Sequence, residues 1–247
     1  FTSSAALVFQ AAEALGADQA GIGSWMLALG LGMGLTCIGL SLRYRAPVVT
    51  AWSTPGAAML ITAAAGVTMA EAVGAFLVCA ALIVAVGFGG WFERAIHRIP
   101  TSIASAMLAG VLLRFGLDVF TAMQSQLALV LAMFAAWLAV RRLLPRYAVP
   151  LALAVGLGVA AARGLLHPGE VRLQLAQPVL VMPEFSLAGL VGVALPLFVV
   201  TMASQNVPGV AVLRACGYGR VPVSPVVGWT GVATLGLAPL GAFALNL

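Results

Sequence analysis

The sequence contains no lysine and few charged residues of any kind. Of its 247 residues, 8% are charged and 62% are hydrophobic, and the mean hydropathy is +1.10. A soluble domain carries about 25% charged residues, so this chain cannot cover a surface that faces water. The scarcity of charge excludes a soluble globular protein and indicates that lipid surrounds most of the chain.

Side chains that bind metals or attack substrates are scarce as well. Cys37, Cys79 and Cys216 lie in or beside apolar stretches, so we interpret them as small apolar side chains rather than as a metal or disulfide set. His97 and His167 fall in predicted loops. The sequence contains no phosphate-binding loop and no arrangement of nucleophile, histidine and acid. We therefore expect no enzyme, no catalytic residue, no cofactor and no metal.

Long apolar segments follow one another along the chain. A helix needs about 20 apolar residues to cross the hydrocarbon core, so we expect an all-α polytopic membrane protein. Because both ends of the sequence lie within apolar runs, we expect a fragment of a longer chain. The predicted helices cover residues 1–12, 21–42, 72–92, 101–117, 125–140, 148–162, 185–206 (continuing toward Ala215) and 221–237; an irregular third segment covers 46–67, a loop 163–184, and a tenth segment begins near Pro239.

The arginines predict the orientation of the chain in its membrane. If the chain starts in the cytoplasm, nine of the twelve arginines fall in inside loops, where basic residues accumulate. Only one acidic residue, Glu93, falls inside. Because the arginines are scattered between apolar runs, we expect no nucleic-acid partner. The inside set is Arg43, Arg45, Arg94, Arg98, Arg141, Arg142, Arg146, Arg214 and Arg220; the outside set is Arg114, Arg163 and Arg172.

The third apolar segment is expected to be broken. Pro47 and the β-branched residues 48–50 favour extended backbone. Ser53 and Thr54, followed by Pro55, are typical of a helix start. A half-helix that starts within the membrane offers free amides and a partial positive charge, which suits an anion. The alternative is an ordinary proline kink.

The eighth helix contains a second polar island, Ser204, Gln205 and Asn206. These side chains are costly in lipid and should face a cavity or the bundle interior; the alternative is a hydrogen bond between helices. Residues 1–10 resemble the stretch that starts at Val200, and Pro239 resembles Pro55. The arginine count gives the two halves opposite directions, so the pattern indicates an inverted repeat with discontinuous segments three and ten.

Several stretches resemble the bacterial benzoate/proton symporter family, and the resemblance extends from end to end. It implies a fold similar to that of the uracil/proton symporter, with seven plus seven helices in inverted repeats, divided into a core and a gate domain. The stretches are AWSTPGAA at 51–58, LAGVLLRFG at 108–116, PRYAV at 145–149, and TMASQN at 201–206 with Pro208, Gly209 and residues 215–218.

This resemblance also implies the domains and the binding site. Core helices of the first repeat would cover residues 1–92, gate helices 93–166, an extracytoplasmic loop 167–184, and the start of the second-repeat core 185–247. The substrate would lie between segments three and ten, beside helices one and eight. The implied binding residues are Ser3, Ser4, Ser53, Thr54, Gly56, Ser204, Gln205 and Asn206, with Pro55 at the start of the half-helix and Trp52 beside the aromatic ring.

We therefore predict a secondary transporter that imports benzoate or a similar aromatic carboxylate with protons by alternating access. No acidic residue lies centrally in an apolar run, so either the substrate acid brings the proton or the carrier group lies elsewhere. A nucleobase or inorganic-anion transporter of the same fold is the nearest alternative. A channel is disfavoured because the polar residues form islands and not a continuous lining. The lipid bilayer is an expected partner, and a homodimer is a candidate assembly.

Overall fold

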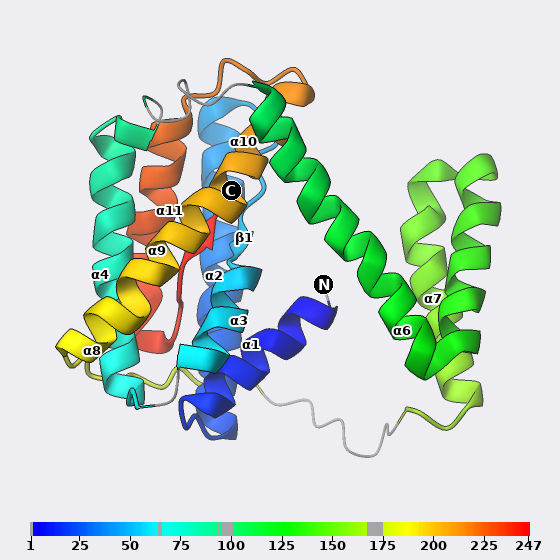
Figure 1. Cartoon of the computed structure of the whole chain (residues 1–247), viewed down its shortest axis with the longest axis horizontal. Coiled ribbons are helices and arrows are strands. Elements are labelled where there is room, and N and C mark those ends of the chain that lie inside the picture. Colours follow the sequence, from blue (N-terminus) through cyan, green and yellow to red (C-terminus); the bar gives the residue numbers. More distant parts are fainter. Residues whose placement is uncertain (1, 64–65, 93, 95–100, 167–174) are drawn as a thin grey trace. The chain divides into compact units, whose positions relative to one another are not determined.

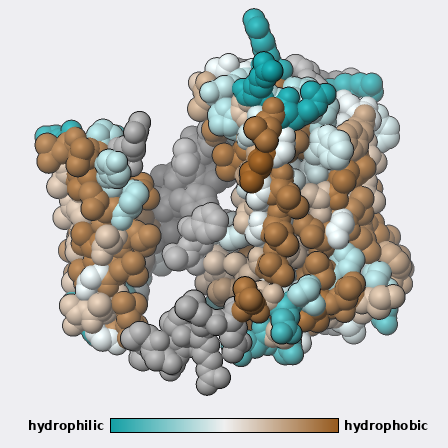
Figure 2. Space-filling view, turned by 180° about the vertical axis from the view of Figure 1, so that it is seen from behind, coloured by the Kyte–Doolittle hydropathy of each residue, from teal (hydrophilic) through white to brown (hydrophobic). Residues whose placement is uncertain are grey.

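The computed structural model describes residues 2–63, 66–92, 94, 101–166 and 175–247. They form two compact units, one from Phe1–Met107 and Ala176–Leu247 and the other from Leu108–Leu175. The described chain is predominantly helical, and five of its helices are long and apolar enough to cross a membrane. Figure 2 shows hydrophobic side chains over the flank of the first unit and hydrophilic ones near its two ends. These features agree with a polytopic membrane protein.

The first unit contains most of the elements (Figure 1). Its predicted third segment is broken as expected, because the chain is extended up to Trp52 and helical from Thr54. The elements are α1 Thr2–Ala14, α2 Gln19–Tyr44, β1 Ala51–Trp52, α3 Thr54–Ala63, α4 Met69–Phe88, α8 Leu187–Gly189, η3 Leu190–Ala194, α9 Leu195–Thr201, η4 Met202–Asn206, α10 Val207–Ala215, α11 Val223–Leu237, η5 Ala238–Leu240 and β2 Leu245–Asn246.

Helix α2 supports the extended stretch that leads into β1. An extended backbone inside a membrane protein must find partners for its N–H and C=O groups. Ser41 Oγ accepts from Val48 N at 3.0 Å and donates to Val48 O at 3.1 Å. The sulfur of Cys37 accepts from Thr50 N at 3.1 Å, and the hydroxyls of Thr36 and Thr50 are 2.6 Å apart. Side chains one helical turn apart on α2 therefore take the place of a neighbouring strand.

The two extended stretches pair with each other. β1 and β2 form an antiparallel pair in which Ala51 faces Asn246 and Trp52 faces Leu245, and Figure 1 shows them side by side among the helices. The expected match between Pro55 and Pro239 is wrong in its position. Pro239 lies in η5, before the extended stretch, whereas Pro55 lies after one. Pro239 therefore corresponds in its role to Pro47, because both prolines precede the extended backbone.

The eighth helix is continuous from Leu187 to Ala215 but contains two π-helical turns. The first turn, η3, ends two residues before Pro196, and the second, η4, ends two residues before Pro208. A proline ring collides with the carbonyl four residues earlier and cannot donate to it. A wider turn absorbs that mismatch without ending the helix, so the sequence remains helical through both prolines.

Close packing of α4 and α11 stabilises the first unit. A Cβ atom on Gly231 would come within 2.9 Å of Ile83 and Val84 side-chain atoms, and Gly87 lies directly against the backbone of Gly228. Small residues let membrane helices approach closely, which increases van der Waals contact. Beside them, the rings of Trp25, Phe76 and Phe243 form a buried cluster with centroids 5.6 to 6.1 Å apart.

The second unit differs from the sequence prediction in one connection. Its elements are α6 Thr101–Leu143, whose first residues belong to the first unit, η1 Pro145–Tyr147 and α7 Ala148–Ala162. We expected a loop at 118–124, but the backbone is helical there and breaks at Gln126, with φ −138° and ψ 54°. Residues 118–126 include several polar side chains but neither glycine nor proline to end a helix. Arg114 and Asp118 therefore lie on helical backbone and not in a loop.

Candidate functional site

The crossing of β1 and β2 collects buried polar side chains from several elements. Ser53 and Thr201 are fully buried, as is Asn206, and Asn246 is 1% exposed. Ser53 joins β1 to α3, Thr201 ends α9, Asn206 ends η4, and Asn246 lies in β2. Four polar side chains in the interior of an apolar unit require a structural or functional reason. We refer to these residues as the crossing site.

The hydroxyl of Ser53 connects three parts of this site. Its oxygen accepts from Thr201 Oγ1 at 3.1 Å and from Gly56 N at 3.2 Å, and the backbone N of Ser53 donates to Ala244 O at 3.0 Å. Ser53 is therefore the N-terminal cap of α3. Because both lone pairs of its oxygen are occupied, its own proton remains as a donor.

Gly56 is needed where α3 approaches α9. A Cβ atom at this position would lie 2.7 Å from Leu197 Cδ1 and 2.8 Å from Ser53 Oγ. Real Cβ atoms do not approach other heavy atoms so closely, so any larger residue would push the start of α3 away from α9. The glycine in the predicted motif therefore sets the distance between segment three and helix eight.

Of the two buried asparagines, Asn206 and Asn246, the sequence indicated only Asn206 as a site residue. Asn206 Oδ1 accepts from Leu247 N at 2.9 Å and holds the end of β2 against the π-helical turn. Asn246 was missed because it lies in an apolar run without a neighbouring polar residue. Its Nδ2 atom is buried and has no hydrogen-bond partner in the described part of the chain. A buried donor without an acceptor costs about 1–3 kcal/mol, so an acceptor atom of a ligand placed here would recover that free energy.

Strand alternation places Asn246 and Ser53 on one face. Residues 51 and 53 point to the side of the pair opposite to Trp52, and residues 244 and 246 point to that same side. Diagonal neighbours on one face of an antiparallel pair lie roughly 7–8 Å apart. The Ser53 hydroxyl proton and the Asn246 amide are therefore two donors that face the same region.

The structure brings together only part of the predicted set. Ser53, Gly56 and Asn206 meet at the crossing, and Thr54 and Pro55 are half-buried in the first turn of α3. Ser204 donates to Val200 O of its own helix at 2.6 Å, and Gln205 is half-buried beside it. Trp52 is 4% exposed and belongs to the apolar core. Ser4 is half-buried on α1, which packs against α3, and Ser3 lies on the same helix, although its side chain is outside the described part.

Comparison with known proteins gives consistent matches over the chain. The family described as benzoate membrane transport protein matches residues 1–247. The inner membrane protein YdcO of Escherichia coli is 47% identical over 247 residues, which cover 100% of this chain and 63% of YdcO. The benzoate membrane transport protein of Acinetobacter baylyi is 35% identical over 241 residues, which cover 98% of this chain and 61% of the relative. The chain thus spans about three fifths of the length of these curated relatives. No solved structure gives a significant match.

Proposed function

The chain belongs to the family of benzoate membrane transport proteins, and from this membership we propose that it forms part of a carrier for benzoate or a similar aromatic carboxylate. The substrate would enter a cell with protons across the inner membrane by alternating access. The single observation that carries the proposal is the buried amide of Asn246, whose Nδ2 atom has no hydrogen-bond partner among the described residues and lies on the same face of the strand pair as Ser53.

The carboxylate would bind by bridging these two donors. Each oxygen of a carboxylate accepts hydrogen bonds at about 2.7–2.9 Å from a charge-assisted donor, so one group can span two donors on the same face. The N-terminus of α3 lies next to Ser53 and adds the partial positive charge of the helix dipole. Ser204 and Gln205 on the eighth helix would complete the polar side of the site.

The rest of the substrate is an apolar ring, and the surroundings of the crossing suit it. Trp52 points to the side of the strand pair opposite to Ser53 and Asn246, so other apolar side chains would contact the ring. Leu197 of α9 reaches toward Gly56. We propose that Ser3 and Ser4 of α1 close the site from the side of α3, because α1 packs against α3. Aromatic acids would then be favoured over aliphatic acids through ring packing.

The paired extended stretches also support the inverted-repeat transporter fold. Segments three and ten each reach the middle of the first unit as extended backbone, and they run in opposite directions. Discontinuous segments that meet near the midplane are typical of binding sites in inverted-repeat carriers. In that fold, helices 1–4 and 8–10 would belong to the core domain and helices 5–7 to the gate.

We propose that proton coupling does not depend on a carboxylate at the crossing site. Among the described residues, the acidic side chains Asp18 and Glu71 lie at helix starts, Glu13 at the end of α1, and Glu184 in the segment before α8. The crossing site itself contains only hydroxyl and amide groups. A neutral site stabilises an anion by hydrogen bonds without titrating, so the proton would travel on the substrate or through residues outside this chain.

Uptake into proteoliposomes tests this function. We expect labelled benzoate to accumulate when an inward proton gradient is imposed, and unlabelled benzoate to compete far better than uracil or sulfate. Ser53→Ala should reduce uptake at low substrate concentration by roughly tenfold, the effect of one lost charge-assisted hydrogen bond. Lack of accumulation in the wild-type protein would refute the substrate. Better competition by uracil or sulfate would favour the corresponding transporter, and single-channel currents would favour a pore.

A further inference from the structure

Three exposed arginines lie at one end of the first unit. Arg43 is in the last turn of α2, Arg45 follows that helix, and Arg220 precedes α11. Ala46 and Val221, the residues that follow Arg45 and Arg220, belong to one buried apolar cluster. The three arginines are therefore neighbours at the same end, and we refer to them as the arginine-rich end.

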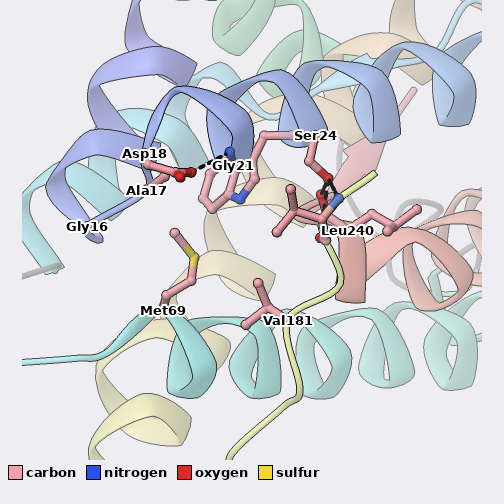
Figure 3. A pocket seen from close by; sticks show the side chains of 10 residues that line it. Gly16, Ala17, Asp18, Gly21, Ser24, Met69, Val181 and Leu240 are labelled. Carbon is pink, nitrogen blue, oxygen red and sulfur yellow. Dashed lines mark hydrogen bonds between the residues drawn. The ribbon is translucent and has the colours of Figure 1, made fainter. Parts of the chain in front are cut away.

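The nearest carboxylates in this unit lie far from these arginines. Residues 36–56 and 204–230 contain neither aspartate nor glutamate. Asp18 caps the opposite end of α2, and Met69, the first residue of α4, lines the same cavity as Asp18 (Figure 3). Glu71 lies in the first turn of α4. The acidic side chains thus gather at one end of α2, and the positive charge at the other end is left for a partner to neutralise.

The length of α2 places the arginine-rich end at the depth of lipid headgroups. This helix has 26 residues and is apolar enough to cross a membrane, so it is about 39 Å long. The hydrocarbon core is about 30 Å thick, and about 40–45 Å with the headgroups. The guanidinium of Arg43 lies 5.7 Å from the centre of the Tyr44 ring, and tyrosine is enriched at the membrane–water interface.

An exposed apolar stripe on α2 leads to Arg45. Leu31, Leu35, Ile38 and Leu42 are 47%, 67%, 63% and 75% exposed. Intervals of four, three and four residues place them on one face of the helix, and Arg45 follows Leu42 by three. An acyl chain that lies along this stripe would therefore bring its phosphate to the arginine.

The backbone of Arg45 is in the left-handed region, with φ 51° and ψ 41°. Every other described residue with a positive φ is a glycine. A side chain makes this conformation costly, and glycine is the usual residue where a helix ends in this way. Arginine is thus a poor choice for the backbone here, and its guanidinium is what it provides in place of glycine.

From these observations we propose that the arginine-rich end and the apolar stripe of α2 bind an anionic phospholipid. The phosphate lies on Arg45 and Arg43, and an acyl chain lies along Leu42 and Ile38. The planar guanidinium donates two parallel hydrogen bonds to a phosphate group. The stripe favours a lipid over a free anion. This interaction goes beyond transport and does not require that the protein carries benzoate.

Native mass spectrometry of the purified full-length protein in non-ionic detergent tests the proposal. We expect dioleoyl phosphatidylglycerol to bind more tightly than dioleoyl phosphatidylcholine. Arg45→Gly should lower the affinity for phosphatidylglycerol about fivefold, the effect of one arginine near the headgroups. Its unfolding temperature should stay the same or rise, because glycine adopts the left-handed conformation readily.

Arg163→Gly is the matched control. Arg163 also follows a helix, α7, but has an ordinary φ of −90°. It is the only arginine in residues 147–171, so no second guanidinium from this stretch joins it. Its removal should leave the affinity for phosphatidylglycerol equal to that of the wild type. An equal loss in Arg163→Gly and Arg45→Gly would indicate a general effect of charge and overturn the proposal.

A second variant and a competitor separate a lipid from a simple anion. Leu42→Gln keeps all the arginines but interrupts the stripe, so it should weaken binding of both lipids several-fold. Inorganic phosphate should displace no more phosphatidylglycerol than sodium chloride does at the same ionic strength, because phosphate has no acyl chain. Equal binding of the two lipids, unchanged binding in Arg45→Gly or Leu42→Gln, or specific displacement by phosphate overturns the proposal. None of these results bears on benzoate uptake.

Discussion

Ser53 joins β1, α3 and α9 through a single hydroxyl group, and its neighbour Gly56 leaves the space for that contact. The Ser53 oxygen accepts from Thr201 and from Gly56 N, while its N–H donates to Ala244 O. The two residues are three positions apart because the third amide of a helix is the one that a capping side chain reaches. The capping hydrogen bond therefore explains both the three-residue interval between Ser53 and Gly56 in the sequence and their contact in the site.

Gly56→Ala should weaken both stability and uptake. The added Cβ would meet Leu197 Cδ1 at 2.7 Å and Ser53 Oγ at 2.8 Å, and overpacking of this kind costs about 1–3 kcal/mol. Thermal unfolding in detergent and benzoate uptake measure the two effects. Gly30→Ala is the control, because no heavy atom lies within 4 Å of its added Cβ. It should be neutral or stabilising by about 0.5–1 kcal/mol. Equal stability of Gly56→Ala and the wild type would contradict the close approach.

Asn246→Ala should separate binding from stability. Its amide nitrogen has no partner in the described chain, so its removal should leave the unfolding temperature nearly unchanged while benzoate affinity falls by roughly tenfold. Isothermal titration and thermal unfolding give the two values.

Asn206→Ala provides the comparison for Asn246. Its carbonyl oxygen accepts from Leu247 N, and its loss leaves that N–H without a partner. We expect Asn206→Ala to lower stability by about 1–3 kcal/mol. If Asn246→Ala were the more destabilising of the two, the amide of Asn246 would have a structural role and not the proposed role in binding.

In the eighth helix, Leu187–Ala215, two prolines are each preceded by a wider, π-helical turn, and the helix continues through both of them. η3 and η4 each precede a proline by the same interval, and η4 contains the polar island with Asn206. A π-helical turn exposes carbonyl groups and shifts the side chains that follow, and such turns are frequent at functional sites. The local mismatch at Pro208 therefore determines which way Asn206 points.

Pro208→Ala should stabilise the helix but reduce uptake. Alanine restores an N–H donor and removes the ring that forces the wide turn, so the turn at Met202–Asn206 can tighten and rotate Asn206 away from Leu247. We expect a higher unfolding temperature together with uptake reduced several-fold. Pro150→Ala is the control, since Pro150 lies in the first turn of α7, where no helical hydrogen bond is lost. Unchanged uptake in Pro208→Ala would show that the π-helical turn is not needed.

On the scale of the whole molecule, basic and acidic residues lie at opposite ends of α2 in the first unit. Arg43 and Arg45 lie at the C-terminal end of α2, and buried Ala46 and Val48 pack against Val221, next to Arg220. Asp18 lies at the other end of α2. This separation gives the first unit an arginine-rich end, and that this end faces the cytoplasm stays a prediction.

Cysteine labelling tests this orientation. Cys216 is exposed after α10, whereas Cys37 is half-buried and Cys79 is buried. A membrane-impermeant maleimide should label the protein in inside-out vesicles but not in intact cells, and Cys216→Ser should abolish the labelling. Labelling in intact cells would invert the proposed topology.

Properties that depend on neighbours along the chain could be predicted from the sequence. The extended-to-helical change at Ser53 follows from proline and capping chemistry, and the bounds of α7 follow from an apolar run between polar residues. The helical break at Gln126 could not be predicted, because neither glycine nor proline marks it. The family, too, was indicated by local motifs, and it was confirmed by matches over the whole chain.

The membrane character of the protein was determined by composition alone, since 8% charged residues cannot solvate a surface in water. Tertiary structure decided which polar groups meet. Asn246 lies in an apolar run and Thr201 in an aliphatic helix, yet both come to the crossing with Ser53 because β1 pairs with β2 and α3 packs against α9. The hydrogen bond between Thr201 and Ser53 joins residues 148 positions apart in the sequence. Such a contact depends on how distant segments pack, and local sequence patterns do not reveal it.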